Sequence, residues 1–354
     1  MKGFIVLESG EVFAGRWLGG TPMAGEVVFN TSHSGYEEIA TDPSYFKQIM
    51  VMSTSQLGNY SNDDEVWESS KIHINGFVGL EIQNSRRESG WLNRLIDAKV
   101  PVIDSLDTRT LIKTLRNMGT VWGAALSAKN EDDAKNLALP LIREYRDKDL
   151  DWARATSCTS PYEVKGSVEA GPVVAVMDFG CKKNIIRELQ KRTSLIKVFP
   201  SNTTSAEIKK FNPQGILLSN GPGNPQDVKG AVETIKELIG WRTIFGICMG
   251  HQLLCMALGG ETYKLKFGHR GSNHPIRDSI LNSIYITSQN HGYAVRSGSL
   301  PEDVEESHFN LNDGTLAGIN CVARKCFSVQ FHPESHPGPR EAEELFDHFI
   351  KRVL

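Results

Sequence analysis

The sequence predicts an α/β protein: a doubly wound, mostly parallel sheet in the C-terminal half, preceded by a smaller, β-rich α/β domain. From residue 172 onward, continuous apolar runs of strand length alternate with amphipathic stretches, which indicates a parallel sheet covered on both faces. Before residue 152, short segments of alternating polarity prevail instead. The 354 residues are enough for two domains of ordinary size, and 40% apolar residues are enough for a core in each.

The N-terminal domain, residues 1–152, is expected to begin with a hairpin, because two segments of alternating polarity flank Gly10. Two helices follow, and the second has signals at both ends, Asp107 as N-cap and Gly119 as its stop. The expected strands are Gly3–Leu7 and Glu11–Arg16, and the expected helices are Ser89–Lys99 and Thr108–Met118. Residues 153–170 mix Ser, Thr, Pro and Gly with charges, so we interpret them as a linker.

The C-terminal domain, residues 171–354, begins with repeated strand–helix units. Right-handed crossovers between parallel strands would place the helices on both faces of the sheet. The expected strands are Val173–Met177, Leu195–Phe199, Gly215–Leu218 and Thr243–Ile247, and the expected helices are Asn184–Lys191, Ser205–Phe211, Val228–Ile239 and Gly250–Leu258. After about residue 264 the pattern becomes strand-rich, and a helix closes the chain. These later elements are Ser283–Thr287, Leu316–Cys321 and Cys326–Gln330, then the helix Glu341–Val353.

Composition and charge argue against several classes of function. The 23% of charged residues leave a net charge of −3 without a basic stripe, so nucleic acid is a poor partner. We expect neither a membrane span nor a signal peptide, because no run of about 18 apolar residues occurs and the first apolar run is short. The 6 cysteines are widely spread without a C-x-x-C pair, which predicts free thiols, no metal site and a cytoplasmic location.

The segment Phe245–Gln252, FGICMGHQ, has the pattern of a nucleophile elbow. An apolar strand runs into a glycine, a cysteine, one further residue, a second glycine and then a helix, so Cys248 would sit on a sharp turn above the carboxyl edge of the sheet. Side chains at Gly246 and Gly250 would collide across such a turn. The helix N-terminus favours a thiolate, and the Met249 N–H is free to face an oxyanion. The alternative is a buried structural thiol at a strand end.

A second signal follows the strand expected at 326–330. His332 and Glu334 lie two residues apart, so in an extended backbone their side chains point the same way, and Pro333 stiffens the step between them. A Cys–His–Glu triad needs this arrangement, since the histidine takes the thiol proton and the carboxylate fixes the histidine tautomer. Such a pair alone is more often a polar cap. Together with the elbow, it predicts a catalytic triad of Cys248, His332 and Glu334.

A third signal is the loop Leu218–Pro225, LSNGPGNP, directly after an expected strand. It lacks the glycine order and the G-K-S ending of a phosphate-binding loop. It is either an ordinary turn or a backbone wall beside the nucleophile, in which the Gly221 N–H supplies the second oxyanion donor.

Two other patterns are set aside. Asp178–Gly180 spells D-F-G, but no other kinase motif accompanies it. His269 and His274 form a conceivable metal pair, yet no third ligand has suitable spacing, so a loop near the active site is the expectation.

The strings GICMGHQ and FHPE, with the loop Asn220–Gly223, resemble the triad-type, or class I, glutamine amidotransferases. The N-terminal half resembles the family of carbamoyl-phosphate synthase small subunits, so the resemblance covers nearly the whole chain. The segments that resemble this family are Gly25–Thr31, Gly35–Glu38, Thr41–Tyr45, Leu57–Asn59, Asp107–Arg109 and Phe267–Pro275. Met249, Tyr293 and Ser272 depart from the common family residues; the first two contribute mainly backbone and bulk, so little is put in doubt.

The resemblance implies the class I glutamine amidotransferase fold for the C-terminal domain and a glutamine site built from both domains. Ser44 would reach over from the N-terminal domain; without the resemblance it would be interpreted as a turn or helix-cap residue. The other glutamine-binding residues that the resemblance implies are Gly221, Gly223, Met249, Gln252, Asn290, Gly292 and Tyr293.

The resulting hypothesis is hydrolysis of L-glutamine to glutamate and ammonia through a Cys248 thioester. A free thiol has a pKa of about 8.5 and is mostly protonated at neutral pH, so His332 is expected to activate it. The resemblance further implies that ammonia passes to a large, ATP-dependent subunit, which makes carbamoyl phosphate from bicarbonate for arginine or pyrimidine synthesis. This large subunit is the expected partner, in a heterodimer or a higher oligomer. ATP and Mg²⁺ are expected there, and no cofactor is expected in this chain.

Two rival functions stay open. One is a cysteine peptidase or γ-glutamyl hydrolase that works without a partner, against which the N-terminal domain argues. The other is a non-catalytic scaffold with an unused triad, against which the complete triad argues.

Overall fold

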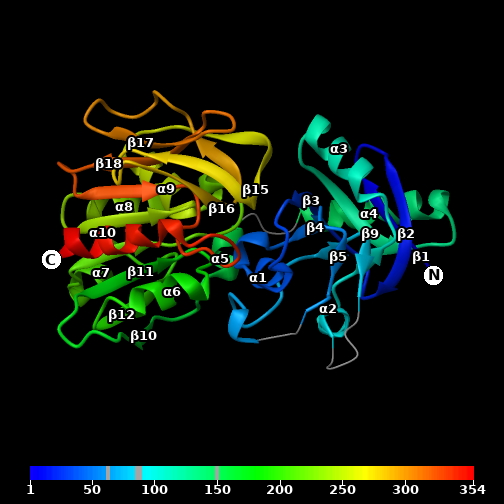
Figure 1. Ribbon diagram of the computed structural model, residues 1–354, viewed down its shortest axis with the longest axis horizontal. Helices are drawn as coiled ribbons and strands as arrows, with labels where there is room; N and C mark the ends of the chain where they lie inside the picture. The colour runs from blue at the N-terminus through cyan, green and yellow to red at the C-terminus, as the bar shows by residue number, and fades with distance from the viewer. Residues whose placement is uncertain (61–63, 84–89, 148–150) are drawn as a thin grey trace. The chain divides into compact units, whose positions relative to one another are not determined.

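The computed structural model describes residues 1–60, 64–83, 90–147 and 151–354. The chain divides into two compact units, whose elements are labelled in Figure 1. The first unit comprises Met1–Asp149 together with Lys266–Gly271, and the second comprises Leu150–Leu265 and Ser272–Leu354. The sequence predicts two domains, but it does not predict that a short segment of the C-terminal half belongs to the first.

The main sheet of the first unit is a closed barrel with the strand order β1-β2-β8-β6-β4-β3-β9. Its strands are β1 Lys2–Leu7, β2 Val12–Gly19, β3 Met23–Asn30, β4 Gln48–Met52, β6 Gly76–Val78, β8 Val102–Asp104 and β9 Val121–Ser127. β1 and β2 pair antiparallel, from Lys2 opposite Arg16 to Val6 opposite Val12, which confirms the predicted hairpin. A separate small sheet pairs β5 Gln56–Leu57 with β7 Glu81–Ile82.

Helix α3 (Thr108–Met118) begins and ends where the sequence predicts. The Asp107 side chain accepts a hydrogen bond from the Thr110 N–H, and Gly119 ends the helix with a φ of 100°. Its buried face packs against side chains of β1, β3 and β4. The other helices of this unit are α1 Tyr36–Thr41, α2 Trp91–Asp97 and α4 Glu131–Arg146, with the 3-10 turns η1 Pro43–Tyr45 and η2 Asp64–Val66. The predicted start of α2, residue 89, lies outside the described residues.

The long strand β15 (Thr262–Asp278) contains the segment that joins the first unit. There the Thr31 N–H donates to the Arg270 carbonyl, and the Thr120 N–H donates to the Lys266 carbonyl. The loop expected around the two histidines of this strand is therefore wrong, because backbone bonds to residues beside β3 and β9 hold the segment extended. Among the described residues, no three potential metal ligands cluster.

The second unit is built on a 10-stranded sheet in the order β10-β12-β11-β13-β14-β19-β18-β16-β15-β17. The central strands β12, β11, β13, β14 and β19 pair parallel, as predicted, and β18 and β17 continue the sheet antiparallel. Its strands besides β15 are β10 Tyr162–Lys165, β11 Val173–Asp178, β12 Leu195–Pro200, β13 Gly215–Leu218, β14 Thr243–Ile247, β16 Ser283–Val295, β17 Glu305–Asn310, β18 Leu316–Cys321 and β19 Cys326–Val329.

Helices cover both faces of this sheet, which confirms the doubly wound arrangement. Ile216 and Ile244 pack with α7, α8 and α9 on one face. Their chain neighbours Leu217 and Phe245 pack with α6 and α10 on the other, because successive strand side chains alternate. The helices are α6 Lys183–Gln190, α7 Ser205–Phe211, α8 Ala231–Leu238, α9 Met249–Ala257 and α10 Glu344–Val353, with η3 Pro225–Asp227 and η4 Glu341–Glu343. No helix within the described ranges has the length and apolarity needed to cross a bilayer.

The segment expected to be a linker, 153–170, contains regular structure. Helix α5 (Trp152–Thr156) overlaps its start, with Asp151 as N-cap. β10 pairs antiparallel with β12 and forms one edge of the sheet. The prediction of a linker was therefore wrong here, because an edge strand of four residues owes its conformation to its partner strand rather than to its own sequence.

Candidate active site

The chain turns sharply at Cys248, between β14 and α9. Cys248 has a φ of 53° and a ψ of −99°, a strained backbone conformation that is characteristic of functional sites. A Cβ atom at Gly246 would lie 2.7 Å from the Gly250 carbonyl oxygen, and one at Gly250 would lie 2.2 Å from the Leu218 carbonyl oxygen. The Cys248 N–H donates to the Val329 carbonyl at 2.9 Å, which joins the turn to β19. This is the geometry of a nucleophile elbow.

The Cys248 sulfur lies between a hydrogen-bond donor and an acceptor. The residue is only 2% exposed. The Gln330 Nε2 donates to the sulfur over 3.6 Å, and the thiol can donate to the Asn290 backbone carbonyl, also at 3.6 Å. Asn290, one of the expected glutamine-binding residues, therefore borders the nucleophile through its backbone.

His332 and Glu334 lie just beyond β19 and face each other. His332 Nδ1 and Glu334 Oε1 are 2.6 Å apart, and both side chains are buried. The His332 N–H donates to the Ser288 carbonyl, which anchors this turn to β16. Burial by itself lowers the pKa of His332, but the charge of Glu334, together with a hydrogen bond to the Cys248 sulfur and the charge of that sulfur when ionised, raises it to about 10. The structure thus brings the three predicted triad residues together and favours a charged imidazole.

A buried lysine, which sequence reasoning missed, adds a positive charge to this arrangement. The Lys182 Nζ lies 3.2 Å from Glu334 Oε1, and both side chains are buried. It also donates to the Ser335 carbonyl, and the Asn184 side chain donates to the Glu334 carbonyl. Burial raises the pKa of Glu334, but the charges of Lys182 and His332 lower it to about 2. The sequence did contain a signal for Lys182. It follows a buried strand closely, at the carboxyl edge of a parallel sheet, where functional residues gather.

The loop after β13 is tied to the elbow. The Gly250 N–H donates to the Ser219 carbonyl at 2.9 Å. A Cβ atom at Gly221 would lie 2.1 Å from the Phe179 carbonyl oxygen, and Gly223 has a φ of 91°, so both positions require glycine. This close packing favours the interpretation of the loop as a backbone wall beside the nucleophile.

Two family models match the chain in sequence. Residues 5–125 match the carbamoyl-phosphate synthase small chain, CPSase domain, and residues 175–352 match glutamine amidotransferase class-I. The chain is 44% identical over 360 residues to the carbamoyl phosphate synthase small chain of Clostridium perfringens, and the match covers 100% of both chains. This chain belongs to the carbamoyl phosphate synthase small-chain family.

Other members of the small-chain family match it at similar levels. The small chain of Caldanaerobacter subterraneus subsp. tengcongensis is 41% identical, covering 100% of this chain and 97% of the relative. The pyrimidine-specific small chain of Halalkalibacterium halodurans is 41% identical, covering 99% of this chain and 97% of the relative. Because the matches span both units, they argue against a peptidase that shares only the amidotransferase domain.

Five further residues that the small-chain resemblance implies lie on two elements of the second unit. Met249 and Gln252 lie in the first turn of α9, and Met249, as its first residue, has a backbone N–H without an acceptor inside the helix. Asn290, Gly292 and Tyr293 lie on β16. The Gln252 Nε2 donates to the Tyr293 carbonyl at 2.8 Å, which ties the two elements together beside the nucleophile.

Ser44 lies in η1 of the first unit. Its backbone N–H donates to the Asp42 side chain at 2.8 Å, so Asp42, and not Ser44, is the N-cap of this turn. Ser44 is buried, with 4% of its surface exposed. Its contribution to a small-chain glutamine site stays a prediction.

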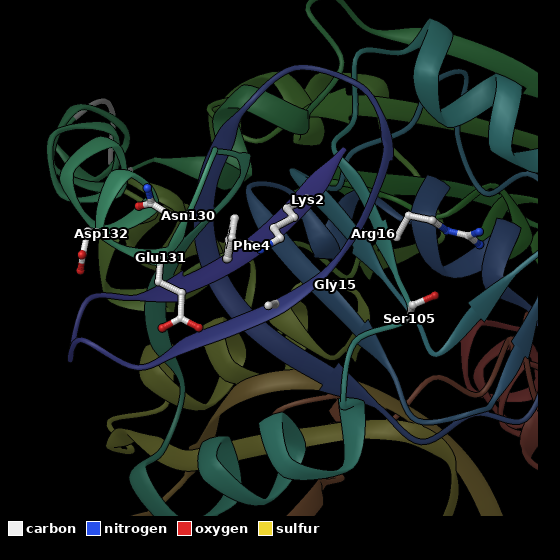
Figure 2. A pocket seen from close by; sticks show the side chains of 9 residues that line it. Lys2, Phe4, Gly15, Arg16, Ser105, Asn130, Glu131 and Asp132 are labelled. Atoms are coloured by element: carbon white, nitrogen blue, oxygen red, sulfur yellow. The ribbon is translucent and has the colours of Figure 1, made fainter.

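A hollow of about 710 Å³ in the first unit is lined by residues of a different kind from those around Cys248. Lys2 and Arg16 on the barrel and Glu131 and Asp132 at the start of α4 are among its lining residues. Figure 2 shows that Arg16 points away from the two carboxylates, and its guanidinium instead pairs with Asp104 at 2.7 Å. With no cysteine or histidine among its lining residues, this hollow offers none of the triad chemistry.

Proposed function

We propose that this chain is the glutaminase subunit of a carbamoyl-phosphate synthase and that Cys248 is its nucleophile. The observation that supports this best is the buried arrangement of Cys248, His332 and Glu334. The carboxylate lies 2.6 Å from the imidazole Nδ1, so Nε2 is the ring atom that exchanges a proton with the thiol.

In the proposed reaction, His332 takes the Cys248 proton, and the thiolate attacks the side-chain amide carbon of glutamine. The resulting oxyanion accepts hydrogen bonds from the backbone N–H groups of Gly221 and Met249. His332 then protonates the leaving ammonia, and the glutamyl group remains on the sulfur as a thioester. Water loses a proton to His332 and attacks the thioester carbonyl. Glutamate leaves, and the proton returns to the sulfur.

The amino-acid end of glutamine is proposed to lie along β16, at Asn290, Gly292 and Tyr293. The Asn290 carbonyl is 3.6 Å from the sulfur, so a substrate held by this strand has its side-chain amide close to the nucleophile. Ser44 is proposed to contact the same substrate.

The ammonia is proposed to pass to a large subunit that binds ATP and Mg²⁺ and makes carbamoyl phosphate from bicarbonate. The full-length similarity to curated small chains supports this division of labour. The product would supply arginine synthesis, pyrimidine synthesis or both. A cytoplasmic location is also proposed, since all six cysteines are free thiols.

The replacement Cys248→Ser tests the proposal in the complex with the large subunit. Glutamine-dependent carbamoyl phosphate synthesis is expected to fall to background, whereas synthesis from added ammonia is expected to continue at the wild-type rate. Equal loss of both activities would contradict the assigned role. Cleavage of peptides, without glutamate release from glutamine, would support a peptidase instead.

A further inference from the structure

Gln330 occupies a position that the triad mechanism does not use. It follows β19 directly and precedes His332 by two residues. Its side chain is fully enclosed, with 1% of the residue exposed, and its backbone N–H donates to the Ala317 carbonyl at 2.8 Å. A buried primary amide must be hydrogen-bonded at both ends to avoid a desolvation cost.

The partners of Gln330 determine which end of its amide faces the nucleophile. The Gln252 side chain contacts the Tyr293 carbonyl at 2.8 Å, and only its NH₂ group can donate to a carbonyl oxygen. The same nitrogen lies 3.0 Å from Gln330 Oε1, which accepts its second hydrogen. The Gln330 NH₂ group must therefore point the other way, where it lies 3.6 Å from the Cys248 sulfur.

The sulfur thus has different partners in its two protonation states. A thiol can donate to the Asn290 carbonyl, which stabilises the protonated form. A thiolate has no proton to donate and is repelled by that oxygen. Its charge is attracted by the neighbouring His332 imidazolium, and it also accepts the N–H of Gln330 as a charge-assisted hydrogen bond. Gln330 therefore opposes the effect of Asn290 and favours the ionised nucleophile.

We propose that Gln330 is a catalytic residue that stabilises the Cys248 thiolate through its side-chain N–H, and that Gln252 holds it in that orientation. The proposal rests on the proposed glutaminase function and adds to it a donor in direct contact with the reacting sulfur. Since Gln252 acts through Gln330, its role here is positioning.

Two substitutions separate the chemical role from mere packing. Gln330→Met keeps most of the side-chain volume but removes the donor. Gln330→Glu keeps an oxygen for the Gln252 NH₂ group but turns a carboxylate oxygen, instead of N–H, toward the sulfur. Gln214 provides the matched controls Gln214→Met and Gln214→Glu, because its exposed amide accepts a hydrogen bond from the Val173 N–H, away from the elbow.

The test measures the rate of Cys248 alkylation by iodoacetamide in the full chain from pH 5 to 10, followed by mass spectrometry of the peptide that contains Cys248. In Gln330→Met the midpoint is expected to rise by about one to two pH units, and the rate at any pH below the wild-type midpoint to fall about 10-fold to 100-fold. Gln330→Glu is expected to show at least as large a shift, and the Gln214 variants none. The pH profile of glutamate release, measured with the large subunit, is expected to shift with the alkylation midpoint.

An unchanged midpoint in both Gln330 variants, with wild-type glutamate release, would overturn the proposal. If one variant fails to show wild-type thermal unfolding, the other decides the question, since the two changes affect packing differently. A wild-type complex that releases no glutamate from glutamine would instead refute the proposed function, so the two failures are distinct.

Discussion

The Lys182 ammonium lies 3.2 Å from the Glu334 carboxylate, and at most 2% of either side chain is exposed to solvent. Glu334 is thereby placed between two cations, the lysine and the imidazolium of His332. A buried carboxylate is costly unless it is paired and hydrogen-bonded. The lysine therefore allows the triad carboxylate to stay ionised in the core, from where it sets the tautomer and charge of the histidine.

Replacing Lys182 by Met is expected to destabilise the protein by about 3–5 kcal/mol, because the buried Glu334 carboxylate would lose one of its two cationic partners and keep only His332. Glutamate release is expected to fall as well, since a protonated Glu334 no longer supports the His332 imidazolium. Urea unfolding and glutaminase assays measure the two effects. Lys183→Met is the control, because the neighbouring side chain is exposed. Equal effects of both substitutions would contradict the role given to Lys182.

The stability of the second unit is expected to depend on pH through the triad. His332 has its pKa raised from 6.5 to about 10, so its contribution is fully present below about pH 6.5 and is lost as pH rises through 10. Glu334 has its pKa lowered from 4.5 to about 2, so its contribution is present above about pH 4.5 and is lost as pH falls through 2. The combined contribution is therefore greatest between about pH 4.5 and 6.5.

The measurement is the difference in free energy of unfolding between wild type and His332→Gln at several pH values. This difference is expected to shrink as pH rises from 6.5 to 10. A substitution of the exposed His33 by Gln provides the control. A difference that stays constant over this range would show that His332 does not carry its proton in the way the geometry implies.

Gly250→Ala is expected to disrupt the elbow. The new Cβ atom would lie 2.2 Å from the Leu218 carbonyl oxygen, so the backbone on one side of the turn must move. Gly259→Ala is the control: its φ of 99° would strain an alanine backbone, but its Cβ atom would meet nothing within 4 Å. We expect the control to cost about 1 kcal/mol in unfolding free energy and to keep glutaminase activity. Gly250→Ala is expected to cost more and to abolish the activity; equal effects would refute this explanation.

Ser44→Ala tests the predicted contribution of the first unit to glutamine binding. The η1 cap uses the Ser44 backbone N–H and the Asp42 side chain, so the cap survives the substitution. We therefore expect little change in thermal unfolding, while the KM for glutamine rises about 10-fold for the loss of one hydrogen bond to substrate. An unchanged KM would remove Ser44 from the glutamine site.

Local sequence patterns were sufficient to predict several elements of this protein. The limits of α3 follow from Asp107 and Gly119, and the parallel strands follow from apolar runs of four to six residues. The elbow at Cys248 was predictable because two glycines and a cysteine between a strand and a helix form a local steric pattern. The pairing of His332 with Glu334 was predicted correctly, but the predicted extended backbone was wrong: the two residues lie in a turn, in which the Ser335 N–H donates to the His332 carbonyl.

Other features depend on residues far apart in sequence. Barrel closure requires β9 to pair with both β1 and β3, and β15 needs partners beside β3 and β9 to hold its first part extended. The residues that pair with β10 and β15 are distant in sequence, so the local sequence of these strands gives no sign of them. Predictions of a linker and a loop at these segments failed because both strands, the four-residue β10 and the 17-residue β15, take their conformation from the backbone groups they pair with.

By itself the sequence determined the order of strands and helices in the parallel part of the second unit, the strained turn at Cys248 and the pairing of His332 with Glu334, because each depends on periodicity or spacing within a few residues. Only the tertiary structure decided that Lys182 neutralises Glu334 and that the Gln330 amide turns its N–H toward Cys248. The charge of a buried group and the orientation of a buried amide are set by whichever neighbours supply the opposite charge or the missing hydrogen bond, and those neighbours come together only when the sheet is assembled.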